Sequence, residues 1–328
     1  MTPNGIQRRH LLCATAGLTA ATLLPTVSSA RDRFPSRPIT LIAPWPAGGS
    51  SDTVLRAFAQ SAGRSLGVPM LVENRPGAGG TLGAAAMLNA RPDGYTLTQL
   101  PLSVFRLPHM QATRFDPVRD ISHIIGLVGY TFGIVATPTA AFSSLQELVR
   151  YARARPGTLE YGHSGHGTTP HLAVEEFSRL AAIELNPIPF GGTADALQAI
   201  LGGHIRVMSG TTEFAPHVRS GRLRLLATLG QQRSPAFADV PTVKESGWNT
   251  ISESPFGIGG PRGLDPLVQQ GLHDAFKQAL HDPQVQSVLE RFFMPTIYMN
   301  SADYAAYAER TFRAERATIE RLGLARRG

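Results

Sequence analysis

Short apolar runs rich in β-forming residues alternate with helical patterns along this chain of 328 residues. Strands that alternate with helices predict βαβ units, largely parallel sheets and an α/β fold. The length suits two domains better than one. The expected strands are 39–43, 70–72, 95–100, 134–136, 159–161, 186–190, 205–208 and 223–228. The expected helices are 54–62, 84–90, 145–155, 170–182, 193–201, 266–281, 283–292 and 301–322.

The first thirty residues have the anatomy of a secretory signal peptide. Arg8 and Arg9 form a positive start, residues 11–24 are apolar, and the small residues Ser28 and Ala30 precede a cut. The apolar stretch is shorter than the roughly 20 residues that favour a spanning helix. The arginine pair also suits twin-arginine export, so the Sec and the twin-arginine routes both stay open. We therefore expect an exported, periplasmic protein.

Removal of that segment would also remove Cys13, the single cysteine of the chain. The remaining chain then has no thiol for a disulfide, a nucleophile or a thiolate metal site. Two arginines and no acids leave with the segment, so the formal net charge falls from +7 to +5. That balance suits an anionic ligand. We expect no cofactor.

Three loops rich in glycine, serine and threonine follow expected strands and open expected helices, at 44–52, 162–171 and 190–195. Backbone N–H groups at such positions are unpaired, and the helix dipole there is positive. In open α/β sheets, ligands bind outside the carboxyl ends of the strands. Loops of this kind from two lobes would form a cleft that holds an anion from both sides.

Two sharper motifs are incomplete. His163, His166 and His171 form a loose cluster, but no nearby acid completes a recognised metal pattern, so we favour loop histidines and expect no metal. The segment 162–166 begins like the nucleophile motif G-x-S-x-G and ends in histidine. An exported hydrolase that uses Ser164 with a nearby histidine stays as an alternative function.

Asp52 and Asp195 lie in expected first helical turns, and each allows two interpretations. A carboxylate there favours the helix dipole and caps N–H groups, which is the interpretation we favour for both. Either side chain could instead contact an ammonium or hydroxyl group of a ligand. For Asp195, that second interpretation would disfavour a ligand with a second carboxylate, because like charges repel.

Six segments resemble family signatures in their expected order: 37–52, 73–80, 91–96, 161–171, 201–204 and 241–247. The first contains a P-x-P-x-G-G-x-x-D loop at 44–52, and 161–171 is similar to Y-G-S-x-G-x-G-S-x-P-H. These signatures resemble the Bug (TctC-like) family, the substrate-binding proteins of tripartite tricarboxylate transporters. His163, Gly191 and Pro255 depart from residues common in that family and leave the solute open.

The resemblance implies a periplasmic-binding-protein-like fold of two α/β lobes hinged around a central ligand cleft. It implies a signal peptide at 1–30, lobe 1 at 31–130, lobe 2 at 131–254, and a return to lobe 1 at 255–328. The crossings are expected near 129–131 and 252–256. The candidate ligand-binding residues are Ala47, Gly48, Gly49, Ser50, Ser51, Asp52, Ser164, His166, Gly167, Thr168, Thr169, His171, Gly192, Thr193 and Asp195.

The implied function is that of an extracytoplasmic receptor, not an enzyme. It would capture a small carboxylate, either an organic acid or an amino acid, for membrane permease subunits. Backbone N–H groups, hydroxyls and ordered water would hold the carboxylate. We expect a monomer that binds no nucleic acid. A ligand-sensing adaptor for a membrane protein is a further alternative.

Overall fold

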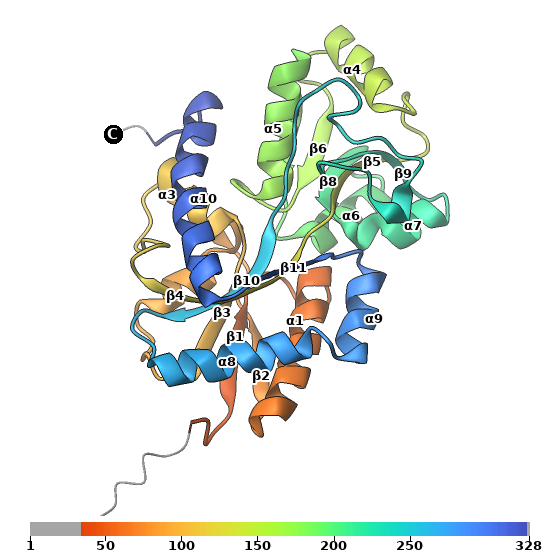
Figure 1. Ribbon diagram of the computed structural model, residues 1–328. Helices are drawn as coiled ribbons and strands as arrows, with labels where there is room; N and C mark the ends of the chain where they lie inside the picture. The colour runs from red at the N-terminus through yellow and green to blue at the C-terminus, as the bar shows by residue number, and fades with distance from the viewer. Residues whose placement is uncertain (1–33, 327–328) are drawn as a thin grey trace, which may run out of the picture. The chain divides into compact units, whose positions relative to one another are not determined.

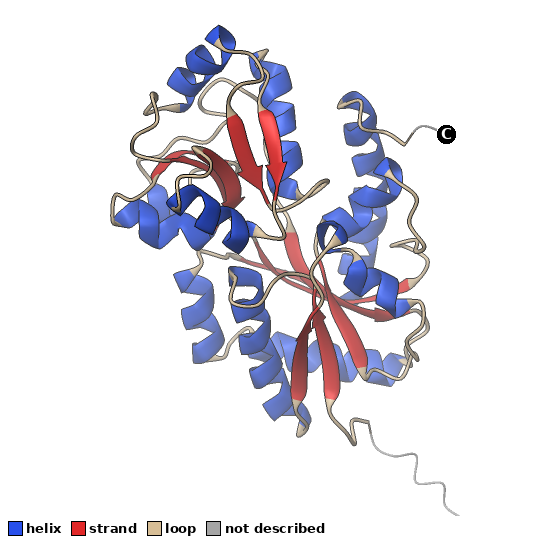
Figure 2. Ribbon diagram, turned by 180° about the vertical axis from the view of Figure 1, so that it is seen from behind, coloured by secondary structure: helices blue, strands red, loops and turns tan. Residues whose placement is uncertain are grey.

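The computed structural model describes residues 34–326, which form two β-sheets with helices packed on them (Figures 1 and 2). The segment predicted as a signal peptide lies outside the described residues. The strands are β1 (Ile39–Ala43), β2 (Met70–Asn74), β3 (Thr96–Leu100), β4 (Ile121–Gly129), β5 (Phe132–Ala136), β6 (Glu160–His163), β7 (Asn186–Pro189), β8 (Val207–Thr211), β9 (Arg224–Thr228), β10 (Pro255–Pro261) and β11 (Thr296–Met299). The helices are α1 (Ser50–Leu66), α2 (Leu82–Met87), α3 (Ser103–Met110), α4 (Leu145–Ala154), α5 (Thr169–Ala181), α6 (Thr193–Leu201), α7 (Ala215–Arg219), α8 (Pro266–Ala279), α9 (Pro283–Arg291) and α10 (Ser301–Arg321).

Both sheets are mixed, so the prediction of largely parallel sheets was wrong. The first sheet has six strands in the order β11-β4-β10-β3-β1-β2, and β10 runs antiparallel to β3 and to β4. The second has five strands in the order β7-β6-β8-β5-β9, and β5 runs antiparallel to β8 and to β9. The parallel parts are β2-β1-β3 and β7-β6-β8, where βαβ units were expected.

The antiparallel strands arise where the chain passes between the sheets. β4 leads directly into β5, and the chain returns from β9 to β10 (Figure 1). The outgoing and returning segments are hydrogen-bonded to each other, since the Tyr130 N–H donates to the Ser254 carbonyl at 3.0 Å. Beyond β10, α8 and α9 pack on α1, and α10 packs on α3 and β4. The last part of the chain therefore lies with the first sheet.

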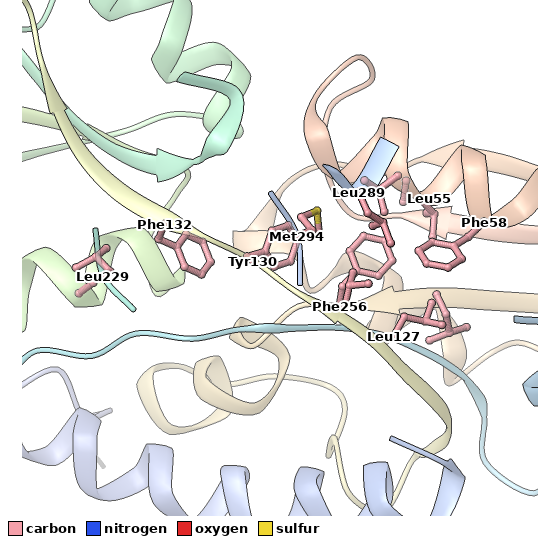
Figure 3. Close-up of a cluster of buried hydrophobic side chains, with 14 of the residues drawn as sticks. Leu55, Phe58, Leu127, Tyr130, Phe132, Leu229, Phe256, Leu289 and Met294 are labelled. Carbon is pink, nitrogen blue, oxygen red and sulfur yellow. The ribbon is translucent and has the colours of Figure 1, made fainter. Parts of the chain in front are cut away.

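A hydrophobic cluster follows this crossing (Figure 3). It runs from Phe58 on α1, through Phe256 and Tyr130, to Phe132 and Leu229 beside the second sheet. The ring centroids of Tyr130 lie 5.7 Å from those of Phe132 and 5.9 Å from those of Phe256. These separations are typical of favourable aromatic pairs. The crossing segments thus belong to a packed core and are not a loose linker.

Candidate functional site

In the described part of the chain, α1, α3, α5 and α6 all begin at one cavity between the two sheets. Its lining includes Gly49 and Ser103 from the side of the first sheet, and Thr168 and Thr193 from the side of the second. The cavity volume is about 50 Å³. On a scale where one water needs roughly 10–15 Å³, that is room for only a few water molecules. The cleft is therefore nearly closed in this structure.

The four helix starts share one feature: their N-cap residues, Gly49, Leu102, Thr168 and Gly192, make no side-chain capping hydrogen bond. The N–H groups of a first helical turn have no acceptor within the helix, and the positive end of the dipole lies there. A cavity where several such ends meet offers hydrogen-bond donors to an anion.

The loop before α1 is held in shape by Asp52. Its Oδ2 accepts a hydrogen bond from the Gly48 N–H at 2.9 Å, and its Oδ1 accepts one from the Asn74 amide at 2.7 Å. Arg56 Nε donates to the same carboxylate at 3.0 Å. Burial raises the pKa of Asp52, but the hydrogen bonds from Arg56, Gly48 and Asn74 outweigh burial and keep that pKa below its usual value. Asp52 does not line the cavity, so it acts on the loop and not on its contents.

The loop before α5 is held by buried histidines. His171 Nδ1 accepts a hydrogen bond from the Gly167 N–H at 3.2 Å. His163 Nδ1 lies 3.0 Å from the Gly165 carbonyl oxygen and 3.2 Å from the Gly165 nitrogen. The two rings lie against each other, with centroids 4.4 Å apart. Burial lowers the pKa of His163 to about 4 and that of His171 to about 3. Both imidazoles are therefore neutral at neutral pH, which lets His171 Nδ1 accept the Gly167 bond.

Ser164 lines the cavity, and its hydroxyl donates to Thr168 Oγ1 at 3.3 Å. Thr168 in turn donates to the Gly165 carbonyl at 2.7 Å. A serine nucleophile needs a base within hydrogen-bond reach, and the partner here is a threonine. Within residues 34–326, no group of three or more His, Cys, Asp or Glu side chains could hold a metal ion.

The structure brings about half of the predicted site residues to the cavity wall. Those that line it are Gly49, Ser51, Ser164, Thr168, Thr169, Gly192 and Thr193. Those outside the lining are Ala47, Gly48, Ser50, Asp52, His166, Gly167, His171 and Asp195. Of this second group, Ser50 donates its N–H to the lining residue Glu213, whereas His166 and Asp195 are exposed.

Sequence reasoning missed Glu213, Thr211 and Tyr130, which also line the cavity. Glu213 Oε1 accepts from the Ser50 N–H at 2.6 Å, and its Oε2 accepts from the Thr211 hydroxyl at 2.9 Å. The Tyr130 hydroxyl lies 2.7 Å from Ser51 Oγ. A signal for Glu213 existed: it follows the carboxyl end of β8, the kind of position that identified the other loops.

Two α/β sheets joined by paired crossing segments, with helix N-termini at a cavity between them, define a periplasmic-binding-protein fold. Two solved structures share it. The periplasmic binding protein BugD has a TM-score of 0.85 and 25% identity, over 90% of this chain and 100% of its own. MatC from Rhodopseudomonas palustris, solved with bound malate, has a TM-score of 0.82 and 26% identity, over 87% and 100%.

The sequence comparisons then identify the family. Residues 54–324 match the tripartite tricarboxylate transporter family receptor (TctC). The "UPF0065 protein in gbd 5'region" of Cupriavidus necator is 45% identical over 327 residues, which are 98% of this chain and 99% of that protein. The chain therefore belongs to the TctC family of receptors, and the predicted Bug resemblance and binding-protein fold are confirmed.

Proposed function

We propose that this protein binds a small carboxylated solute in the cavity between its two sheets and presents it to a membrane transporter. The observation that carries the proposal is the convergence on one cavity of helix N-termini whose own N-cap residues make no side-chain capping bond. The malate in MatC, which has the same fold, supports a carboxylate as the solute class. The Ser164–Thr168 bond does not favour the alternative of a serine hydrolase, so we propose binding without chemistry.

Solute entry in this proposal requires two lobes to separate, because the cavity of about 50 Å³ has room for only a few water molecules. We assign 31–130 and 255–328 to one lobe and 131–254 to the other, with the hinge near 129–131 and 252–256. The strand order supports this assignment, since β1 to β4, β10 and β11 share one sheet and β5 to β9 share the other.

The proposal places the receptor outside the cytoplasm, after cleavage of residues 1–30 by the Sec or the twin-arginine route. BugD, described as a periplasmic binding protein, supports this location. Among residues 34–326, no helix has both the length and the apolar character needed to cross a membrane. A monomeric receptor would then meet permease subunits at the membrane, and a sensing role would use the same solute site.

A thermal-shift panel tests the proposal. Mono-, di- and tricarboxylates and amino acids are compared with neutral sugars. A bound solute at one hundred times its Kd should stabilise the protein by about 2.7 kcal/mol. Stabilisation by sugars with no response to any carboxylate would contradict the proposal. Turnover of an ester panel would support the alternative of a serine hydrolase.

A pair of variants locates the site. Ala194 lines the cavity in the first turn of α6, whereas Gln198, one turn later, is exposed and outside the lining. Ala194→Trp should fill the cavity and abolish the shift, and Gln198→Trp should keep it. Equal responses of the two variants would place the solute elsewhere.

A further inference from the structure

Glu213 holds an unusual place for a carboxylate in a cavity built for anions. It lies in the short 3-10 turn Thr212–Phe214 after β8 and reaches across the cleft to the start of α1. There its Oε1 accepts the hydrogen bond of the Ser50 N–H at 2.6 Å. One of the donor-bearing helix ends is thus already occupied by a carboxylate of the protein.

Within residues 34–326, the cavity lining contains an acidic side chain and no basic side chain. Among the described residues that line the cavity, Glu213 is the one acidic side chain, and no lysine, arginine or histidine is in that lining. Asp52, the nearest other acid on α1, is outside the lining and already bonded to Arg56. A carboxylate of the solute near Glu213 would therefore meet a like charge with no cation to offset it.

Every hydrogen-bond donor that acts on Glu213 in this structure is a neutral group. A carboxylate has about four acceptor sites on its two oxygens. The Ser50 N–H and the Thr211 hydroxyl donate to Glu213, and the hydroxyls of Ser50 and Thr193 also act on it as hydrogen-bond donors. Burial in the cleft raises the pKa of Glu213, while the hydrogen bonds from Ser50 and Thr211 oppose that rise. A cationic N–H donor from the solute would replace one of the neutral hydroxyl donors and offset the charge of the carboxylate.

We propose that Glu213 is the specificity-determining residue of this receptor, and that it selects a solute whose carboxylate is accompanied by an ammonium group. This inference rests on the proposed function, because it takes the solute to lie in the cavity. In the bound state, the ammonium group donates to Glu213 at the α1 end. The solute carboxylate lies toward the first turns of α5 and α6, on the opposite wall. Dicarboxylates without an ammonium group are excluded.

The sequence offered Asp195 as a candidate for choosing between kinds of carboxylate, and the structure favours Glu213 for this role. Asp195 is exposed and outside the cavity lining, whereas Glu213 is inside it. Asp195 is nonetheless an acid on the same side of the cleft. It therefore serves as a matched control for the removal of a negative charge.

The test compares matched ligand pairs by isothermal titration calorimetry on the wild-type protein. L-alanine and methylmalonate differ only in whether an ammonium or a carboxylate joins the same carbon. 3-Aminopropanoate and succinate differ likewise at the end of the same spacer, and longer pairs extend the series. The wild type should bind the ammonium member at least about tenfold more tightly. Equal or tighter binding of the dicarboxylate members would overturn the inference and leave the proposed function standing.

Glu213→Gln keeps the side-chain shape, and its amide oxygen still accepts from the Ser50 N–H. It should reduce the preference for the ammonium member by about tenfold, by weakening that member and admitting the dicarboxylate. Asp195→Asn should leave the ratio unchanged. A ratio that responds to Asp195→Asn and not to Glu213→Gln would overturn the inference. Binding of no member of any pair by the wild type would count against the proposed function itself.

Discussion

The two glycine-rich loops on opposite walls of the cleft are built to the same plan with different chemistry. In each, a glycine N–H donates to a side chain four residues later, from Gly48 to Asp52 and from Gly167 to His171. Both glycines have a left-handed φ, +85° and +73°, which side chains rarely adopt. One acceptor is an ionised carboxylate, and the other is an imidazole that accepts only while it is neutral. The two walls should therefore respond differently to substitution and to acid.

The largest effect is expected from Asp52→Ala, which acts on the loop before α1. It leaves the Gly48 N–H without its acceptor and removes one of the two acceptors of the half-buried Asn74 amide, the other being the Trp45 carbonyl. Asp52 itself is only 4% exposed. We expect a loss of about 2–4 kcal/mol of unfolding free energy, measured by urea denaturation, and at least tenfold weaker solute binding. Asp52→Asn can still accept from Gly48 and should lose less. Unchanged binding in the alanine variant would show that the loop does not need this acceptor.

As the pH falls, the histidines of the loop before α5 should lower the stability of the protein before Asp52 of the loop before α1 does. Between about pH 6.5 and 4, the unfolded chain binds protons at His163 and His171 while the folded chain does not, so stability falls as the pH falls. Each histidine contributes at most about 1.4 kcal/mol per pH unit in that window. Asp52 contributes a constant amount there, because its lowered pKa removes stability only below its ordinary value of 3.8.

The substitution His171→Asn distinguishes the pH dependence of the loop before α5 from that of the loop before α1. Asparagine can accept from the Gly167 N–H but does not titrate, so unfolding free energies measured from pH 7 to pH 5 should fall less steeply than in the wild type. Asp52→Asn should leave that slope unchanged. An altered slope in both variants, or in neither, would contradict the expected difference between the two loops. His123, buried on β4 with its pKa lowered to about 4 by burial, adds the same background slope to every variant.

The smallest effect concerns a contact that joins the walls. Arg106 on α3 makes two hydrogen bonds to Glu315, at 2.6 and 2.9 Å, and donates to the Gly167 carbonyl at 3.3 Å. Lysine cannot reproduce this fork. Arg106→Lys should lower the unfolding free energy by about 1 kcal/mol and weaken solute binding two- to fivefold, as measured by denaturation and calorimetry. The exposed pair Arg316–Glu320 is the control, since Arg316→Lys should change neither quantity.

The sequence was sufficient to predict the strand–loop–helix units but not the crossing strands. β1 with α1 and β6 with α5 follow local apolar patterns, whereas β10 contains Gly257, Gly259 and Gly260, which weaken any strand pattern. A Cβ on Gly257 would lie 2.3 Å from Tyr304 atoms, so a tertiary contact requires that glycine. No local pattern reveals that contact, because Tyr304 lies on α10, far along the chain.

The candidate site divides in the same way. Loops that open helices could be predicted because their chemistry is local, and seven of the predicted residues line the cavity. The position of Glu213 after β8 has a local signal, but its contact with Ser50 could not be predicted, because the two residues are 163 positions apart. Which loop ends face each other depends on how the crossing segments orient the two sheets.

The paired crossing has a mechanical consequence. The Tyr130–Ser254 hydrogen bond joins two segments into a narrow ribbon. A second hydrogen bond, from the Thr131 hydroxyl to the Phe293 carbonyl at 2.8 Å, connects the ribbon to a third segment. A ribbon of this kind bends readily across its thin direction but resists sliding and twisting, because those motions break its cross-links. The two lobes are therefore expected to open by rotation about a single axis. Every solute, whatever its length, would then enter and leave by the same hinge motion.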